Sequence, residues 1–153
     1  MSRRTILSTL VATLLVALSQ TSCDKLPANG DLDGMWQLLT IETPDGLRQV
    51  KQERVYLSIQ LQLAQWTDYT RGTLFYSHFA HRGDSLFFFD FAKPSDHSLE
   101  SNNDEWISTD EMTSGILDAW GIHTLDARYH ILQLSGENLV LEKTDTILRF
   151  RIF

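Results

Sequence analysis

Three residues that can bind a metal recur at intervals of three in the middle of the chain: His78, His81 and Asp84. On a helix this spacing would bring the two imidazoles and the carboxylate to one face, where they could hold zinc. The neighbouring residues alternate as in a strand that runs into a turn, where the three side chains would not converge. We therefore expect solvated polar residues around a hairpin here, and no metal site.

A candidate nucleophile follows directly. Gly83-Asp84-Ser85-Leu86 resembles the block that names a family of serine esterases, in which the serine lies between a strand and a helix. In that family an Asp-x-x-His near the C-terminus supplies the base. Here the block opens an aromatic strand, and the stretch from Asp126 to His130 has one residue too many. We interpret the block as a hairpin turn with Gly83 at positive φ, and expect no enzyme activity.

Charge and composition exclude other kinds of chemistry. The formal net charge of −7 argues against nucleic acid and against an electrostatic hold on anionic lipid. The acidic stretch from Asp96 to Glu111 lacks the Asp-x-Asp-x-Asp-Gly order of a calcium loop, so we interpret it as a solvated loop. The eight glycines are scattered and form no phosphate-binding loop. We expect no cofactor.

The only cysteine, Cys23, follows a segment typical of an export signal. Arg3 and Arg4 give a positive start, and the apolar run from Ile6 to Leu18 is shorter than the roughly 20 residues of a membrane-spanning helix. Ser22 is small, as the residue before a lipoprotein cleavage site usually is. The alternatives are an uncleaved anchor and plain secretion.

This segment resembles a bacterial lipoprotein signal in which Gln20 replaces the usual leucine. The resemblance implies a signal peptide over residues 1–22 and a lipid on Cys23. A short tether would follow over residues 23–33, and one domain over residues 34–153. It also implies a membrane-anchored protein of the cell envelope, in the outer membrane rather than the inner. With no second cysteine, no disulfide can stabilise the domain.

Strand patterns dominate the domain. Apolar and polar residues alternate from Val55 to Leu63 and from Leu148 to Ile152, which is typical of strands with one buried face. Turn residues such as Pro44-Asp45-Gly46 separate the strands. The expected strands cover residues 34–42, 53–64, 71–80, 84–92, 104–108, 128–134, 138–143 and 147–152. Their spacing predicts an all-β, mainly antiparallel fold, a barrel or a sandwich.

One short helix interrupts the strands. Ser108 and Glu111 match a capping box, and Gly121 stands where a helix commonly ends. Ile116, Leu117 and Trp120 would then fall on one helical face and bury it against an end of the barrel. The pattern predicts about three turns of helix, placed before the last three strands, with Trp120 in a packing role.

Gly34-Met35-Trp36 at the start of the domain and Arg149-Phe150-Arg151 at its end resemble the lipocalin, or calycin, pattern. Together with Trp120-Gly121-Ile122, the domain resembles the bacterial lipocalin-like lipoproteins. The resemblance implies an up-and-down β-barrel of about eight strands. It also implies a structural kernel of Gly34, Trp36 and an arginine stacked on Trp36. We favour Arg151, in a cation–π contact worth about 0.5–2 kcal/mol.

The aromatic residues are the remaining functional signal. Alternation predicts that Phe87, Phe89 and Phe91 share one face and that Phe88 lies on the other. An eight-stranded barrel is either filled by side chains or holds one small ligand. The predicted apolar-ligand site consists of Trp66, Phe75, Tyr76, Phe87, Phe89 and Phe91. Two alternatives stay open: the aromatic residues only fill the core, or the barrel is a ligand-free module that binds a protein partner.

Overall fold

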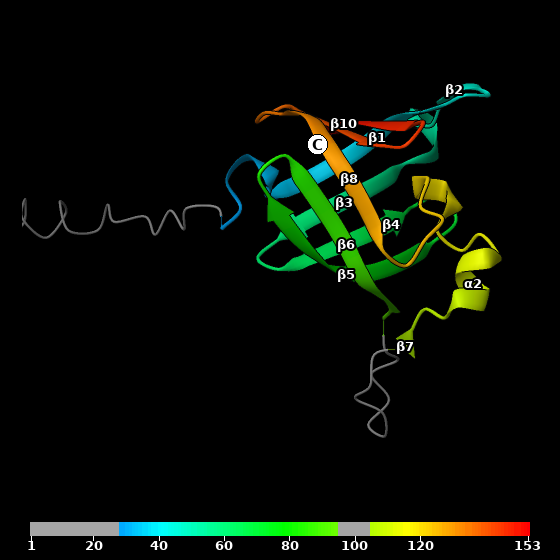
Figure 1. Cartoon of the computed structure of the whole chain (residues 1–153). Helices are drawn as coiled ribbons and strands as arrows, with labels where there is room; N and C mark the ends of the chain where they lie inside the picture. The colour runs from blue at the N-terminus through cyan, green and yellow to red at the C-terminus, as the bar shows by residue number, and fades with distance from the viewer. Residues whose placement is uncertain (1–27, 95–104) are drawn as a thin grey trace, which may run out of the picture.

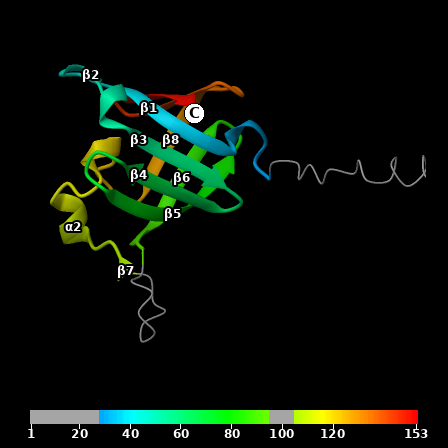
Figure 2. The ribbon, with the colours of Figure 1, turned by 180° about the vertical axis from the view of Figure 1, so that it is seen from behind.

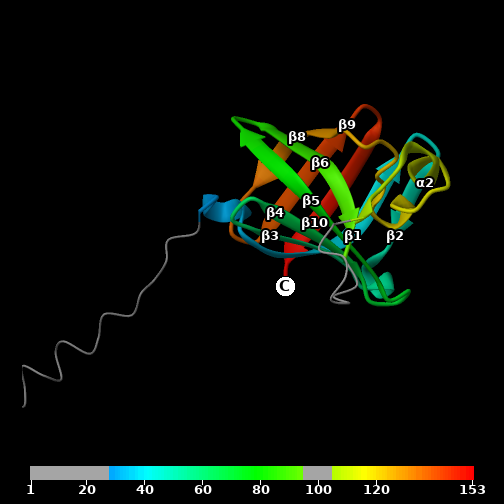
Figure 3. The same ribbon diagram turned by 90° about the horizontal axis from the view of Figure 1, so that it is seen from below.

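The computed structural model describes residues 28–94 and 105–153, which form one closed antiparallel barrel (Figure 1). Eight strands make the ring in the order β1-β3-β4-β5-β6-β8-β9-β10, and β10 pairs with β1 to close it. Figure 2 shows the wall from β1 to β5, and Figure 3 shows β9 and β10 on the other side of the ring. The predicted all-β, eight-stranded barrel is confirmed.

The ring strands have the following bounds: β1 Gly34–Thr43, β3 Val55–Gln60, β4 Leu63–Asp68, β5 Thr73–Arg82, β6 Ser85–Lys93, β8 Ala127–Leu134, β9 Asn138–Lys143 and β10 Thr146–Ile152. Two short strands lie beside the ring. The strand β2 (Gly46–Gln49) pairs with the end of β1, and β7 (Glu105–Trp106) pairs with the end of β6. The prediction over 104–108 therefore corresponds to a side strand.

The predicted strand over 53–64 is wrong in its extent. A two-residue turn at Leu61 and Gln62 divides this stretch into β3 and β4, which pair from Val55–Asp68 to Gln60–Leu63. Leu61 has a φ of 57°, a left-handed conformation that alternation of apolar residues does not signal. The predicted and observed rings both have eight strands. The prediction treats β3 and β4 as one strand, and it includes β7, which lies beside the ring.

The predicted helix is present but shorter. The α-helix α2 covers Thr109–Thr113 and begins with the expected capping box of Ser108 and Glu111. A separate 3₁₀ turn, η3 (Asp118–Trp120), ends at Gly121, whose φ of 69° fits a C-cap glycine. The helix lies before β8, β9 and β10, as predicted.

The two ends of the barrel are covered by different segments. The 3₁₀ turn η1 (Gly30–Leu32) leads into β1 at one end, where the indole Nε1 of Trp36 donates to the carbonyl of Leu32. We call this the η1 end. The segment α2–η3 lies at the opposite end, to the right in Figure 1. There Trp120 enters the core and its Nε1 donates to the carbonyl of Tyr56 over 3.2 Å.

Large aromatic side chains pack in the interior. The largest fully buried ones are Trp36, Trp66, Trp120, Tyr129, Phe88, Phe91 and Phe150. The Trp66 ring lies 4.7 Å from that of Phe88 and 6.4 Å from that of Trp120, both in edge contacts. These contacts join the barrel wall to the α2–η3 segment in one apolar core.

Candidate functional site

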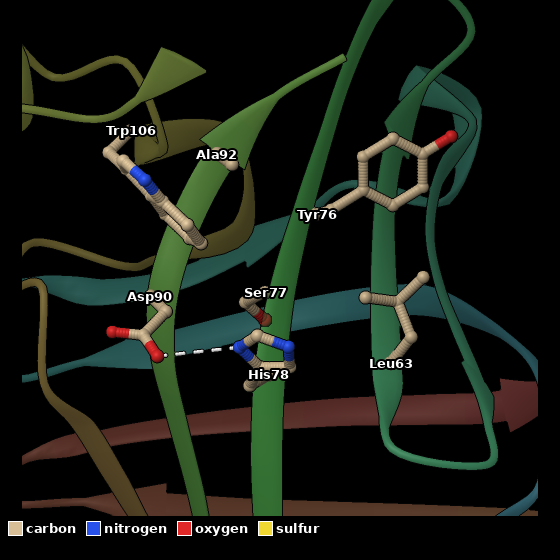
Figure 4. Close-up of a pocket in the computed structure, with 7 residues that line it drawn as sticks. All are labelled: Leu63, Tyr76, Ser77, His78, Asp90, Ala92 and Trp106. Carbon is tan, nitrogen blue, oxygen red and sulfur yellow. Dashed lines mark hydrogen bonds and ion pairs between the residues drawn. The ribbon is translucent and has the colours of Figure 1, made fainter. Parts of the chain in front are cut away.

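A pocket of about 230 Å³ opens on the outer wall of the barrel, where β4, β5, β6 and β7 lie side by side. We call it the wall pocket. It is lined by Leu63, Tyr76, Ser77, His78, Asp90, Ala92 and Trp106. Figure 4 shows Trp106 and Asp90 on one side, Tyr76 and Leu63 on the other, and His78 between them.

A β-bulge places Asp90 in the lining of this pocket. Tyr76 pairs with Ala92 and His78 pairs with Phe89, so β6 has one residue more than β5 between these two pairs. Asp90 takes up the extra length at a φ of 53°, in the left-handed region that Asp tolerates better than most residues. The bulge turns Asp90 outward, and its Oδ2 lies 3.3 Å from Nδ1 of His78.

The pocket combines apolar walls with one polar pair. Leu63, Tyr76, Ala92 and the Trp106 indole supply the apolar surface, and 54% of Trp106 is exposed. The His78 imidazole contacts the Asp90 carboxylate, and its ring centroid lies 5.9 Å from that of Phe89. The arrangement can hold a small apolar group while His78 or Asp90 forms a hydrogen bond to a polar atom.

The predicted ligand residues divide into two groups. Trp66, Phe75 and Phe91 are buried in the barrel core, where the Trp66 indole Nε1 donates to Ser77 over 2.9 Å. Tyr76 lines the wall pocket. Phe87 and Phe89 alternate with the buried Leu86 and Phe88, and so lie on the outer wall. The Arg128 guanidinium packs over the Phe87 ring, 4.5 Å from its centroid.

The prediction that Phe87, Phe89 and Phe91 share one face is therefore wrong. The strand alternates normally as far as Phe89, and then the bulge at Asp90 shifts the pattern by one residue. As a result Phe88 and Phe91 both point inward. Simple alternation along the strand does not predict that Phe88 and Phe91 share a face, because an Asp in a strand is only a weak sign of a bulge.

The kernel residues lie close together but do not form the expected stack. Gly34 has a φ of 145°, and a Cβ there would lie 2.6 Å from Cδ1 of Ile152. Trp36 points into the barrel, and Ile152 is its partner on β10. Arg151 pairs with Gln37 on the outer face and donates to its Oε1 over 3.2 Å. Arg151 and Trp36 are thus on opposite faces of the sheet.

Two buried hydroxyls, those of Thr40 and Tyr129, have no hydrogen-bond partner within the described residues. The Tyr129 OH points into the interior and makes no hydrogen bond within the described residues. Burial raises the pKa of this phenol, so it stays neutral. A neutral hydroxyl in this position is compatible with a buried water molecule.

The residues considered for chemistry do not form a catalytic arrangement. Ser85 Oγ donates to Asp84 over 3.2 Å, and His130 Nδ1 lies 3.5 Å from the other oxygen of Asp84. The carboxylate thus stands between the serine and the imidazole, whereas a general base has to contact the serine directly. His81 lies against the carbonyl of Gly83 instead. Residues 28–94 and 105–153 contain no cluster of three potential metal ligands.

The other predictions concern parts of the chain outside the described residues. Cys23, the signal peptide and most of the tether fall within residues 1–27, and much of the acidic stretch falls within residues 95–104. Among the described helices, none has both the length and the apolar character that crossing a membrane requires.

The closed barrel, with a 3₁₀ turn leading into its first strand, defines a class of small antiparallel barrels. The profile of the lipocalin-like domain matches residues 16–153, so the chain belongs to the lipocalin-like domain family. The sequence resemblance to lipocalins is confirmed. No curated protein matches the chain significantly.

Solved structures share this fold at low sequence identity. A lipocalin-like protein from Bacteroides uniformis is 21% identical, with a TM-score of 0.57 over 81% of this chain and 100% of that chain. An uncharacterized protein from Bacteroides eggerthii is 19% identical, with a TM-score of 0.55 over 80% of this chain and 99% of that chain. A protein from Burkholderia xenovorans is 14% identical, with a TM-score of 0.50 over 79% and 82%.

Proposed function

We propose that this protein is a lipid-anchored binding protein of the cell envelope that holds a small apolar ligand in its wall pocket. Membership of the lipocalin-like family supports a binding role, since lipocalins typically take small hydrophobic molecules. The sequence around Cys23 supports the anchor. The observation that carries the proposal is the apolar wall pocket with the His78–Asp90 pair at one side.

The dimensions of the pocket restrict the ligand. Its volume of about 230 Å³ lies below the roughly 300–1,000 Å³ of pockets for drug-sized molecules. The ligand is therefore a small molecule, or one apolar end of a longer one. Burial of apolar surface contributes about 25 cal/mol per Å². The exposed face of Trp106 is the largest ring available for that contact.

Trp106 also provides the test. The chain has four tryptophans, and Trp36, Trp66 and Trp120 are fully buried. The apolar probe N-phenyl-1-naphthylamine should bind the mature protein, shield Trp106 from acrylamide and shift its indole NMR signal. Trp106→Ala should lower the affinity for the probe by about tenfold or more, and a tenfold loss corresponds to about 1.4 kcal/mol of binding free energy. Tyr69→Ala, at an exposed aromatic residue that does not line the wall pocket, should leave the affinity unchanged.

Equal affinity in Trp106→Ala and the parent protein would show that the probe binds elsewhere and would contradict the wall pocket. Native mass spectrometry of the protein purified from its own host should also show a small molecule that copurifies with the parent protein. That adduct should be reduced in Trp106→Ala.

The anchor requires a separate test. The parent protein should take up labelled palmitate and sediment with membranes, while Cys23→Ala should do neither. A Cys23→Ala protein that remains in the membrane fraction would contradict lipid attachment at this residue.

The second candidate function is a protein-interaction module of the envelope. It is favoured by the exposure of Leu63 (44%) and Trp106 on the same wall, because apolar surface of this kind also marks protein contacts. A photo-crosslinking residue at position 76 would distinguish the two candidates in intact cells. A stoichiometric protein adduct supports the module, whereas a small-molecule adduct supports the binding protein.

A further inference from the structure

An exposed leucine occupies a strained position in the turn between β3 and β4. Leu61 is 67% exposed and has a φ of 57°. The corresponding position of the β5–β6 turn holds Gly83, with a φ of 61°. Glycine adopts this conformation without steric cost, whereas a leucine at this φ is sterically strained. An apolar side chain at this site thus contributes neither burial nor turn stability to the barrel.

The turn is connected to the segment that follows Cys23. The Asn29 side chain donates its Nδ2 hydrogen to the carbonyl of Leu61 over 2.9 Å, and it also contacts the carboxylate of Asp33. The Leu61 turn therefore lies at the η1 end of the barrel, beside the point where the described chain begins. Leu63, which is 44% exposed, follows this turn at the start of β4 and adds further apolar surface near this end.

Covalent geometry limits how far this end can be from a lipid on Cys23. An extended chain covers at most about 3.6 Å per residue, so the stretch from Cys23 to Asn29 spans no more than about 22 Å. A barrel anchored through Cys23 must keep its η1 end within that distance of the membrane. Figure 1 shows β2 and α2 at the opposite end of the barrel, which is the end farther from the attachment point.

The charges at the η1 end favour one kind of contact. Asp31 in η1, Asp84 in the β5–β6 turn and Glu137 in the β8–β9 turn are exposed there, with Arg82 and Arg151 nearby. Acidic groups at this end weaken any attraction to anionic lipid. The contact therefore depends on apolar insertion.

We propose that the η1 end faces the membrane and that Leu61 inserts into the zwitterionic lipid surface. This inference rests on the proposed lipid anchor at Cys23. It explains why a strained turn position carries a leucine, and it gives the barrel a fixed orientation. Any ligand or partner at the opposite end would be presented to the aqueous compartment.

The test uses the full-length, lipidated protein in phosphatidylcholine vesicles. Because the thiol of Cys23 is consumed by the lipid, Gln62→Cys provides one reactive thiol beside Leu61, and Arg48→Cys on β2 provides one at the opposite end. An environment-sensitive fluorophore at position 62 should emit at shorter wavelength in vesicles and be quenched by nitroxide-labelled lipid. The same fluorophore at position 48 should not respond.

Leu61→Asn in the Gln62→Cys background separates membrane contact from stability. Asn accepts positive φ, so this variant should melt at the same temperature as its parent or higher, while the blue shift and quenching decrease. Leu61→Gly should behave in the same way.

The results separate the two proposals. Mass spectrometry that finds no lipid on Cys23 would overturn both the anchor and this inference. With lipid present, an aqueous signal at position 62, or one that Leu61→Asn leaves unchanged, would overturn the inference alone.

Discussion

A single carboxylate joins the α2 helix to the barrel wall. Glu111 Oε2 accepts from the backbone N and the hydroxyl of Ser108, and its other oxygen accepts from Lys93 Nζ at the end of β6. Lys93 also donates to Glu105 over 3.1 Å. The Lys93 hydrogen bond, followed by those of Ser108, lowers the pKa of Glu111 to about 2. The ionised form of Glu111 is therefore the one that the folded protein stabilises.

This pKa shift predicts a pH-dependent contribution to stability. Because the folded-state pKa lies below the unfolded value of about 4.5, the contribution is complete above that value and is lost as the pH falls towards 2. Glu111→Gln keeps a side chain compatible with the capping box but removes the charge. The parent protein should melt at a higher temperature than Glu111→Gln at pH 6, and this difference should shrink at pH 3. A difference that is equal at both pH values would contradict the role of the charge.

At the scale of elements, the segment α2–η3 covers one end of the barrel with apolar side chains. Trp120 is fully buried, its ring lies 5.8 Å from Phe75 and 6.4 Å from Trp66, and its indole donates to the Tyr56 carbonyl. Gly121 follows in a left-handed conformation, and a Cβ there would lie 3.1 Å from Leu148. The segment is therefore part of the core.

Removing the Trp120 side chain should destabilise the whole barrel. Large-to-small substitutions at buried aromatic residues cost about 3–5 kcal/mol, so Trp120→Ala should lower the free energy of unfolding by about that amount. Trp106→Ala, at the exposed tryptophan, should change it by less than about 1 kcal/mol. Urea denaturation followed by circular dichroism gives both values. A loss in Trp120→Ala as small as that expected for Trp106→Ala would mean that α2–η3 contributes little to the core.

How well the sequence predicts these elements depends on the local signal. A helix start is indicated by the capping box of Ser108 and Glu111, and a helix end by Gly121. Alternation of apolar and polar residues indicates most strands. Leu61 and Asp90 carry no such signal, although each takes a positive φ that changes the path of a strand. The hairpin and the bulge were missed for this reason. The wall pocket could not be predicted, because it depends on the bulge and on the pairing of β7 with β6.

At the scale of the whole molecule, closure of the ring holds the fold together. β1 pairs with β10 from Trp36–Ile152 to Glu42–Ile147, and β10 contributes the buried Leu148 and Phe150 to the core. The single cysteine excludes an internal disulfide, so packing and strand pairing must supply the stability. Each ring strand has a neighbour on both sides, which leaves little free edge for unwanted pairing.

Removal of the last strand should therefore open the barrel and expose two edges. A chain that ends at residue 145 should lose cooperative melting and associate, as judged by circular dichroism and size-exclusion chromatography. A chain that lacks only Phe153, which is 71% exposed, is the matched control and should remain folded and monomeric. A monomeric chain with an unchanged melting temperature after removal of residues 146–153 would contradict this account.

The β1–β10 seam also has a consequence for the order of events in time. It joins the first ring strand to the last, and the Arg149–Glu42 ion pair across it connects residues 107 positions apart. Pairings between distant parts of a chain form slowly, and proteins dominated by them fold in about milliseconds to seconds. The seam cannot form before the C-terminal residues are available. The barrel can therefore close only in a chain that includes β10. Any chain that stops before β10 keeps its first strand unpaired on one side.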